Sequence, residues 1–462
     1  MLNAVIVGAG HRALGYAKYA ELHPDRLRVV GVADLFPERR QAVARLYSLA
    51  PEHCFESLDA MLAHGRIADV AINGTMDHQH VATTIPLLET GYDVLLEKPF
   101  AVNAGELRKL AEGVHKTGHK VMICHVLRYA PFYREIKARI AAGAVGEIID
   151  IQTAEHVSYH HFSACYVRGK WGRQDACNGA TSLRAKCSHD LDLIAWLKNG
   201  IRPVSVDSMG SLRYFTRKNA PEHSGTHCLL DLEPFSEFGL FQSSTNVNNE
   251  LVALQSPAVM TEVVKRLHLD HPVRWAAYIW PELAYLPERN TPEQRRAALC
   301  NPAHPYSRCV WKCDNDQPDR QSVMIEFEDG SLATHSMIAD TARPMRRIHV
   351  IGTEGEIEGV FDDNHFVVRH RDLRPGHEYG EEVVDTGDLG DTTGAYGDHG
   401  GGDLRLVEDF VNYSEGKPAS LSCTALTDSL TGHLLVFAAD EARLRKRRID
   451  FTEFCKGITA IR

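Results

Sequence analysis

Short β-branched runs alternate with helix-like stretches through the first 125 residues of the chain. A run of this kind is typical of a strand that is buried within a sheet. The expected strands are residues 4–7, 29–33, 70–72, 94–96 and 121–123, and the clearest helical stretch between them is 104–116. This alternation predicts a doubly wound parallel sheet of the α/β class.

The pattern changes after about residue 125, where a second sheet is expected. Its strand-like segments are 148–152, 322–328, 332–337, 348–351 and 367–369. Gly330 predicts a hairpin turn between the second and third of these segments. Two helical patterns, at 403–413 and 425–443, precede a closing segment at 448–451.

These changes divide the chain into two expected domains, 1–125 and 126–462. Residues of about 250–310, rich in Pro, Trp and Tyr, resemble an insertion in the second domain, and 385–403 is a long Gly/Asp-rich loop. The C-terminal helices are expected to pack back on the first domain.

Composition narrows the class of protein. The chain has 462 residues and a formal net charge of −10. This charge argues against nucleic acid and against an anionic membrane surface as partners. No apolar stretch is long enough for a membrane helix, and the N-terminus lacks the features of a signal peptide. We therefore expect a cytoplasmic protein that acts on a small molecule.

The 11 cysteines are scattered along the chain, so a disulfide framework is not expected in a reducing compartment. Cys300, Cys309 and Cys313 form the tightest group, with His304 among them. A zinc site and a set of buried thiols are both compatible with this group, but its spacing matches no regular zinc finger or ribbon. The sequence therefore predicts no metal site.

A glycine-rich turn directly follows the first expected strand and opens a helix, with the sequence Gly8-Ala9-Gly10-His11-Arg12-Ala13. Gly8 permits the tight turn, and Gly10 lets the backbone approach a pyrophosphate. The small Ala13 lets helix and sheet pack closely. The amino end of the helix then attracts the phosphates. The turn predicts a dinucleotide site that includes His11 and Arg12.

Asp34 ends the next expected strand. A carboxylate at this point can accept both ribose hydroxyls of the cofactor and repel a 2′-phosphate. Asp34 therefore predicts NAD as the cofactor. Arg39 and Arg40, one helical turn further on, leave NADP as the alternative.

Polar residues also follow the third and fourth expected strands, whose carboxyl ends point into the ligand crevice of such a sheet. Thr75 and His80 come after the third strand, and Glu97 and Lys98 come after the fourth, before a proline. All four are expected in the cofactor site. Lys98 is also placed to reach a substrate hydroxyl and is the first catalytic candidate.

Together these motifs resemble the glucose-fructose oxidoreductase/inositol dehydrogenase/MocA (Gfo/Idh/MocA) family. The motifs occur in order along nearly the whole chain: Gly8-x-Gly10, Asp34, Thr75 with His80, Glu97-Lys98-Pro99, His125-x-x-Arg128-Tyr129-x-Pro131, His189-x-x-Asp192 and Ile351-Gly352-Thr353-x-Gly355. The resemblance implies a Rossmann domain followed by an α/β domain with a large open mixed sheet. It also implies nicotinamide-dependent chemistry on sugars or polyols, and a homo-oligomer formed through the C-terminal sheet.

The family's usual aspartate-x-x-x-histidine pair falls on residues 185 and 189, and this chain departs from it. His189 is present, and imidazole titrates near working pH, so we expect a general base there, with a core histidine as the alternative. Ala185 replaces the aspartate. Asp192 lies one helical turn after His189 and is expected either to orient its imidazole or to be structural.

Lys186 stands beside the missing carboxylate and is the third catalytic candidate. A buried lysine needs a counter-charge. Either an anionic group of the substrate or a protein carboxylate, Asp190 or Glu155, is expected to supply it.

Further polar and aromatic residues are candidates for the substrate face, because aromatic rings stack on sugars and Arg or His binds anionic groups. A structural role is the alternative for each. With Lys186 and Asp192, the set is Arg128, Tyr129, Tyr159, His160, Tyr166, Arg168, Trp171 and His399.

Three functions remain open. The leading hypothesis is an NAD-dependent oxidoreductase that moves hydride between nicotinamide and a hydroxyl or keto carbon of a sugar or polyol. The alternative is an NAD-dependent glycoside hydrolase that uses transient oxidation, elimination and re-reduction with no net redox change. A non-enzymatic regulator is a third reading, which the retention of Lys98 and His189 disfavours.

Overall fold

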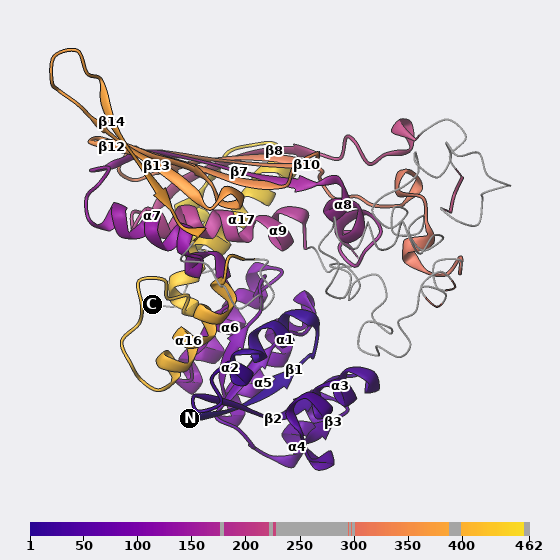
Figure 1. Cartoon of the computed structure of the whole chain (residues 1–462). Helices are drawn as coiled ribbons and strands as arrows, with labels where there is room; N and C mark the ends of the chain where they lie inside the picture. Colours follow the sequence, from indigo (N-terminus) through magenta and orange to yellow (C-terminus); the bar gives the residue numbers. More distant parts are fainter. Residues whose placement is uncertain are drawn as a thin grey trace, which may run out of the picture.

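The computed structural model describes residues 1–175, 180–220, 225–227, 294, 297, 301–387 and 399–456. Most of the expected insertion at about 250–310, the middle of the 385–403 loop and Cys300 therefore lie outside the described residues. Two sheets, each with helices packed against it, make up the described chain (Figure 1). No described helix is long and apolar enough to cross a membrane.

The first sheet has six parallel strands in the order β3-β2-β1-β4-β5-β6. They are β1 (Leu2–Val7), β2 (Leu27–Ala33), β3 (Cys54–Phe55), β4 (Val70–Asn73), β5 (Asp93–Leu96) and β6 (Val121–Ile123). The five expected strands are confirmed. The sequence analysis missed β3, because two residues carry no readable periodicity.

Helices cover both faces of this sheet, as doubly wound topology requires (Figure 1). They are α1 (His11–Ala17), α2 (Tyr19–Leu22), α3 (Pro37–Tyr47), α4 (Leu58–His64), α5 (His80–Thr90) and α6 (Ala104–Thr117). The strand order reverses between β1 and β4, so the crevice for a ligand opens at their carboxyl ends.

The second sheet has nine strands in the order β14-β13-β12-β11-β7-β10-β9-β8-β15 and is mixed, because β7 and β10 are parallel. The strands are β7 (Ile148–Ser158), β8 (Pro203–Ser211), β9 (Arg320–Phe327), β10 (Leu332–Thr341), β11 (Met345–Gly352), β12 (Gly355–Val360), β13 (His365–Arg371), β14 (Tyr379–Asp385) and β15 (Ile449–Asp450). The sequence analysis missed β8, β12 and β14. The expected hairpin at Gly330 is confirmed between β9 and β10.

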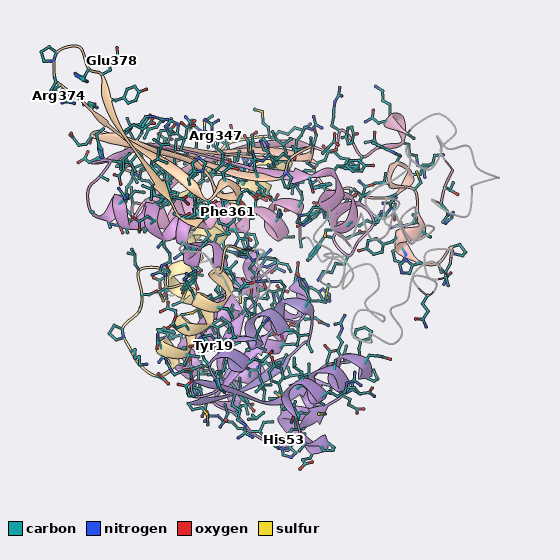
Figure 2. The ribbon with its side chains drawn as sticks, in the orientation of Figure 1. Tyr19, His53, Arg347, Phe361, Arg374 and Glu378 are labelled. Atoms are coloured by element: carbon teal, nitrogen blue, oxygen red, sulfur yellow. The ribbon has the colours of Figure 1, made fainter. Side chains whose placement is uncertain are left out.

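Three helices pack under one face of the second sheet: α7 (Pro131–Ala141), α9 (Ser182–Leu197) and α17 (Leu426–Arg445) (Figure 1). Figure 1 shows no described helix over the opposite face. Large apolar side chains are exposed in the sheet, among them Ile149, Met209, Met324, Leu332 and Ile338. The β13–β14 hairpin projects from one end of the sheet, with Arg374 and Glu378 near its tip (Figure 2).

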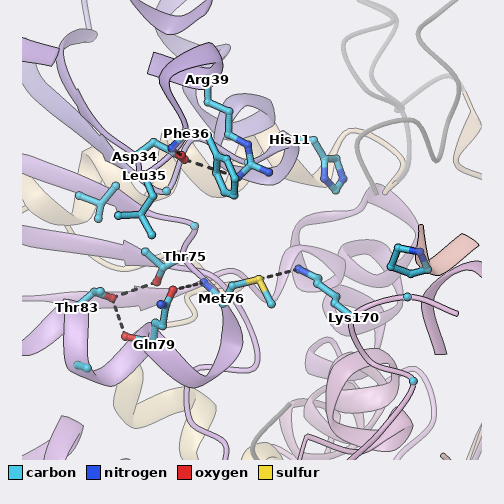
Figure 3. A pocket seen from close by; sticks show the side chains of 18 of the residues that line it. His11, Asp34, Leu35, Phe36, Arg39, Thr75, Met76, Gln79, Thr83 and Lys170 are labelled. Carbon is cyan, nitrogen blue, oxygen red and sulfur yellow. Dashed lines mark hydrogen bonds and ion pairs between the residues drawn. The ribbon is translucent and has the colours of Figure 1, made fainter. Parts of the chain in front are cut away.

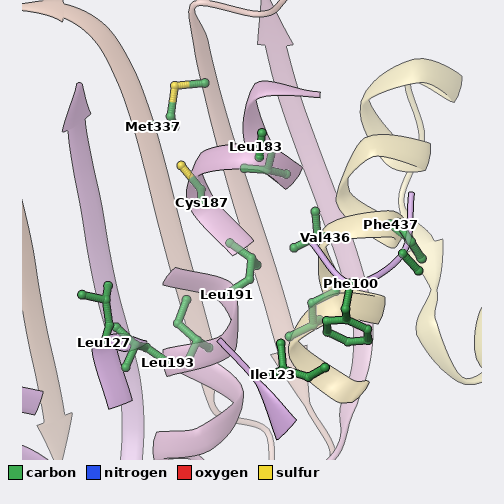
Figure 4. Packing of buried hydrophobic residues seen from close by; sticks show 14 of the residues in the cluster. Phe100, Ile123, Leu127, Leu183, Cys187, Leu191, Leu193, Met337, Val436 and Phe437 are labelled. Carbon is green, nitrogen blue, oxygen red and sulfur yellow. The ribbon is translucent and has the colours of Figure 1, made fainter. Parts of the chain in front are cut away.

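The two sheets are joined by shared cores. Phe100 and Ile123 of the first unit pack in one buried cluster with Leu191 of α9 and Phe437 of α17 (Figure 4). The helix α16 (Gly402–Ser414) lies against α1 and α2 (Figure 1), and its Phe410 belongs to the core of the first sheet. These contacts fix the second sheet and its helices over the carboxyl edge of the first sheet, where the crevice opens.

Candidate active site

The turn after β1 is built for close backbone approach. Gly8 has φ +76°, and a Cβ there would lie 2.8 Å from the Thr75 backbone nitrogen. A Cβ on Gly74 would lie 2.8 Å from the Cβ of Ala13. The turn between β1 and α1 thus packs directly on the loop after β4, and larger side chains at these positions would separate them. The small residues expected for a dinucleotide cradle occupy the positions that need them.

Asp34 lies just beyond β2 and is nearly buried. One carboxylate oxygen accepts the backbone N–H of Ala9 at 2.7 Å, and the other accepts that of Phe36 at 2.8 Å. Arg39 approaches the carboxylate at 3.7 Å, and its guanidinium also lies over the Phe36 ring. The glycine-rich turn therefore holds the Asp34 carboxylate at the edge of the crevice.

A cavity of about 850 Å³ runs along this edge (Figure 3). Gly8, Gly10, Asp34 and Thr75 line one side, and the segment 167–173 lines the other. A volume of this size lies in the range of cofactor sites. The donor set also fits a dinucleotide, because backbone N–H groups at the amino end of α1 suit a pyrophosphate and the Asp34 carboxylate suits a ribose.

A second cavity of about 240 Å³ adjoins the first, and both are lined by Gly10, His11, Gly74, Thr75 and Lys170. The smaller cavity brings together all three catalytic candidates of the sequence analysis. Lys98, Lys186 and His189 line it, although the first comes from the end of β5 and the others from α9.

Lys98 is enclosed where β5 ends, and the Lys98–Pro99 peptide bond is cis. Its ammonium donates to the Ala185 carbonyl at 2.5 Å. Burial lowers the pKa of Lys98, and Glu97 and Asp77 only partly offset this effect. An ammonium with a lowered pKa gives up its proton more readily, which suits acid–base exchange with a hydroxyl.

His189 is buried on α9, and its Nδ1 has no hydrogen-bond partner among the described residues. Burial lowers the pKa of His189 well below its usual value, and the charge of Lys98 adds to the effect. The imidazole is therefore neutral near pH 7, so a ring nitrogen without a partner can accept a hydrogen bond from a hydroxyl. The ring of His399 lies 6.0 Å away, centroid to centroid, and also lines the cavity.

Arg12, which was expected in the cofactor site, lines the smaller cavity and not the larger one, and it is bound to protein carboxylates. Its guanidinium makes two hydrogen bonds to Asp403, of 3.0 and 2.9 Å, and one of 3.1 Å to Glu97. Tyr16 donates to the same Glu97 oxygen at 2.6 Å. Burial opposes ionisation of Glu97, but Arg12 and Lys98 outweigh it and lower the pKa of the carboxyl. This network ties α1, β5 and α16 together beneath both cavities.

His80 holds the backbone around Lys98 in place. Its ring nitrogens lie 2.8 Å from the Pro99 carbonyl and 3.0 Å from the Thr75 carbonyl. It thereby connects the loops after β4 and β5, which carry the walls of the smaller cavity.

Lys186 meets a protein carboxylate, which is one of the two outcomes expected for it. Its ammonium lies 3.1 Å from Glu155, whose other oxygen lies 2.7 Å from Arg346. Arg346 also approaches Asp190 at 3.2 Å. This cluster contains two carboxylates and two cationic side chains. The positive charge of Lys186 is therefore balanced within the protein and does not require an anionic substrate.

Asp192 does not orient His189. Its carboxylate accepts two hydrogen bonds from Arg128, of 2.7 and 2.6 Å, and lies 3.0 Å from His125. Burial opposes this charge, but Arg128 and His125 lower the pKa of Asp192 to about 2. Helical spacing puts residues 189 and 192 near one face of α9, but the facing guanidinium captures the carboxylate.

The structure divides the remaining substrate candidates. Tyr166, Trp171 and His399 line the smaller cavity, whereas Arg168 lines the larger one. Arg128 and Asp192 are buried outside both cavities, Tyr129 donates to Asp409, and Tyr159 packs against Phe215. His160 lies in the short helix α8 (Tyr159–Phe162), but its side chain lies outside the described part of the chain.

Several residues that line the smaller cavity were not among the sequence candidates: Tyr16, Asp77, His156, Met345, Arg346 and Phe361, whereas Glu155 was expected only as a partner of Lys186. Glu155 occupies an inward-facing position of β7, a strand that begins with apolar residues. A charged residue at an inward-facing position of such a strand is unusual, and this feature of the sequence could have marked Glu155 as a site residue. Arg346 is the second residue of β11 and lies opposite Glu155 only through the pairing of β11 with β7.

Two cysteines of the group near residue 310, Cys309 and Cys313, lie in its described part. Cys309 is buried, and the Cys313 thiol lies 3.2 Å from the Cys309 carbonyl. Burial raises the pKa of Cys313. Cys300 lies outside the described residues.

Comparison with known proteins connects this geometry to a family. Residues 2–125 match the GFO_IDH_MocA family model, described as an oxidoreductase family with an NAD-binding Rossmann fold. The oxidoreductase YteT of Bacillus subtilis (strain 168) is 23% identical over 427 residues, which cover 89% of this chain and 88% of YteT. Residues 2–125 form an NAD-binding Rossmann domain of the Gfo/Idh/MocA oxidoreductase family, and the similarity to YteT extends along most of the chain.

Other family members match in sequence or in fold. Inositol 2-dehydrogenase of Rhizobium meliloti (strain 1021) is 27% identical over 207 residues, covering 45% of this chain and 58% of that protein. A levoglucosan dehydrogenase solved with NADH and L-sorbose superposes with a TM-score of 0.65 at 16% identity, over 98% of this chain and 100% of the other. An oxidoreductase from Agrobacterium radiobacter, solved with NAD⁺, L-tartaric acid and magnesium, gives a TM-score of 0.64 at 13% identity, over 98% and 99% of the chains.

Taken together, these matches establish the Rossmann sheet, the nine-stranded mixed sheet of the C-terminal domain and NAD(P)-dependent oxidoreductase chemistry. Similar structures differ in their nicotinamide cofactor. One from Desulfitobacterium hafniense is described as an NADPH-dependent oxidoreductase, whereas the levoglucosan dehydrogenase was solved with NADH.

Proposed function

We propose that this protein uses NAD to oxidise or reduce a hydroxyl-bearing carbon of a sugar or polyol. The observation that carries the proposal is the junction of the two cavities, where Lys98 and His189 line the chamber beside the dinucleotide cradle. Relatives described as inositol 2-dehydrogenase and levoglucosan dehydrogenase support a polyol or sugar as the substrate class.

The chain's own residues can perform the proton transfer that such a reaction needs. A bound nicotinamide supplies the hydride acceptor or donor. In the oxidative direction, neutral His189 takes the hydroxyl proton, and the Lys98 ammonium stabilises the developing alkoxide. Tyr166 and Trp171 offer aromatic surface for a sugar ring on the opposite wall.

Asp34 supports NAD over NADP. Both of its oxygens already bind backbone N–H groups, so the carboxylate cannot swing away from a 2′-phosphate. Calorimetric titration with both cofactors tests this preference, and we expect NADP to bind more weakly by a few kcal/mol, at about 1–3 kcal/mol for each unsatisfied polar group. Equal affinities would contradict it.

Product analysis tests the function directly. The protein is incubated with NAD and a panel of matched sugars, polyols and glycosides, and absorbance at the NADH band and reaction products are followed together. Accumulation of NADH with a ketone or lactone product supports the dehydrogenase. The matched control is Lys98→Met, which should abolish both signals.

One observation favours a second function, redox-neutral glycoside cleavage. The Trp171 indole donates to Asp77 at 2.6 Å, and the Lys170 ammonium lies 3.4 Å from the Met76 sulfur (Figure 3), so the second domain is bonded to the loop after β4, beside both cavities. A cofactor enclosed in this way suits a cycle in which it is reduced and re-oxidised without leaving. Release of aglycone with no net NADH would decide for this function.

We also propose a homo-oligomer formed through the open face of the nine-stranded sheet. The apolar side chains exposed there, including Met324 and Ile338, are expected to be covered by a second copy. Light scattering on Met324→Glu should show dissociation relative to the wild type, whereas Leu373→Glu at the exposed hairpin tip serves as the control.

A further inference from the structure

A group of three metal-ligating side chains lies behind the candidate base. Cys187 and Asp190 are one turn apart on α9, and His335 faces them from β10. The Cys187 sulfur, a carboxylate oxygen of Asp190 and a ring nitrogen of His335 all lie within 4.8 Å of one another. All three residues are at least 98% buried. Figure 4 shows Cys187 and Met337 of β10 close together in this packed layer.

His335 is held in the orientation of a metal ligand. Its Nδ1 lies 2.9 Å from the Thr153 hydroxyl, which itself lies 3.3 Å from the Thr334 carbonyl. A hydroxyl that donates to this carbonyl can accept only from an Nδ1–H group, so the lone pair of the neutral ring is on Nε2. Nε2 is buried and has no hydrogen-bond partner among the described residues. Second ring nitrogens fixed in this way are usual for metal-binding histidines.

Asp190 presents a second unpartnered atom. Its Oδ1 lies 3.2 Å from Arg346, whereas its Oδ2 is buried without a hydrogen-bond partner in the described chain. Glu155 binds both Arg346 and Lys186, so the two nearby cations are already paired with carboxylates. A carboxylate that binds a guanidinium through one oxygen keeps the other free for a metal ion.

We propose that Cys187, Asp190 and His335 bind a Zn²⁺ ion. Thiolate and imidazole ligands select zinc over magnesium or calcium, and a carboxylate completes a set of three protein ligands. Binding forms the zinc–sulfur bond as the Cys187 thiol loses its proton to solvent. The ion would join α9 to β10 immediately behind His189, and thereby fix the helix that carries the candidate base. The proposal does not depend on which substrate the enzyme uses.

Metal analysis of the full-length protein tests the site. Protein expressed with added zinc and passed over a chelating resin should retain about one zinc per chain, because all three ligands come from the same chain. Cys187→Ser and His335→Gln should each reduce bound zinc by about tenfold or more. Cys423→Ser, which alters a buried cysteine of another region, should leave the zinc content unchanged.

Cobalt substitution gives an independent readout, and its first result comes from the wild-type protein and does not depend on the folding of any variant. Titration of metal-free wild-type protein with Co²⁺ should produce a sulfur-to-cobalt charge-transfer band in the near ultraviolet, and Asp190→Asn should weaken it. Wild-type protein with neither retained zinc nor a charge-transfer band would overturn the proposal. A band that persists in a folded Cys187→Ser variant would also overturn it.

Discussion

Arg128 allows a direct test of whether a buried charged residue near the site stabilises the fold or binds the substrate. Its guanidinium is buried and makes two hydrogen bonds to Asp192 and one each to the carbonyls of Cys423 and Asp428, at 3.0 Å. It lines neither cavity. We predict that Arg128→Met destabilises the fold without changing substrate affinity.

The magnitude follows from the charge that is left behind. Arg128, together with His125, lowers the pKa of Asp192 from 3.8 to about 2, which corresponds to about 2–3 kcal/mol at about 1.4 kcal/mol per pH unit. Two carbonyls also lose a charged donor. Removing one partner of a buried pair typically costs about 3–5 kcal/mol, and we expect a loss in this range.

Urea unfolding at pH 7 measures this loss, with tryptophan fluorescence and circular dichroism required to give coincident transitions. Arg202→Met is the matched control, because its guanidinium pairs with Glu328 on the surface and should contribute less than about 1 kcal/mol. The double variant Arg128→Met/Asp192→Leu should regain part of the loss, since no unpaired charge remains.

Steady-state kinetics on the folded variant complete the test. A loss of stability with KM unchanged is the expected result. If Arg128→Met instead left the free energy of unfolding within about 1 kcal/mol of the wild type and raised KM, the pair would be substrate-binding, and the structural assignment would be refuted.

Two further predictions concern the site, and a third concerns the pH dependence of stability. Lys98→Met should keep the fold and cofactor binding but lower kcat by about 10²–10⁴, because a positioned acid–base group is removed; a turnover equal to the wild type would contradict this. Gly8→Ala should weaken cofactor binding in calorimetry, because a Cβ at φ +76° would lie 2.8 Å from the Thr75 nitrogen. Burial lowers the pKa of His433 to about 3, so below about pH 6.5 the unfolded chain binds a proton that the folded chain does not. Stability should therefore fall as pH drops from 6.5 towards 3, at up to about 1.4 kcal/mol per pH unit for this group, and the slope of urea-unfolding energies should shrink in His433→Phe.

The sequence by itself determined the cofactor half of the site. Gly8, Gly10, Asp34 and Thr75 all lie within a few residues of a strand end, and in a parallel sheet every carboxyl end reaches the same edge. Local spacing therefore fixes which residues meet. The same logic gave the five long strands of the first sheet but not β3, whose pairing depends on β2 rather than on its own two residues.

Only the tertiary structure decided the partners of the second half. Helical spacing placed Asp192 near His189, but Arg128, far away in the sequence, captured its carboxylate. Lys186 had two expected partners, and the position of β7 beside α9 selected Glu155.

The candidate zinc ligands show the same limit. Cys187 and Asp190 are neighbours on one helix, but His335 comes from β10 and meets them only when that strand pairs with β7 under α9. Contacts between residues so distant in the sequence depend on how helices and sheets pack, and side-chain periodicity reports which face is buried, not what lies opposite. The sequence thus specified the chemistry that each element carries, and the packing of α9 against the second sheet decided which of those groups face one another.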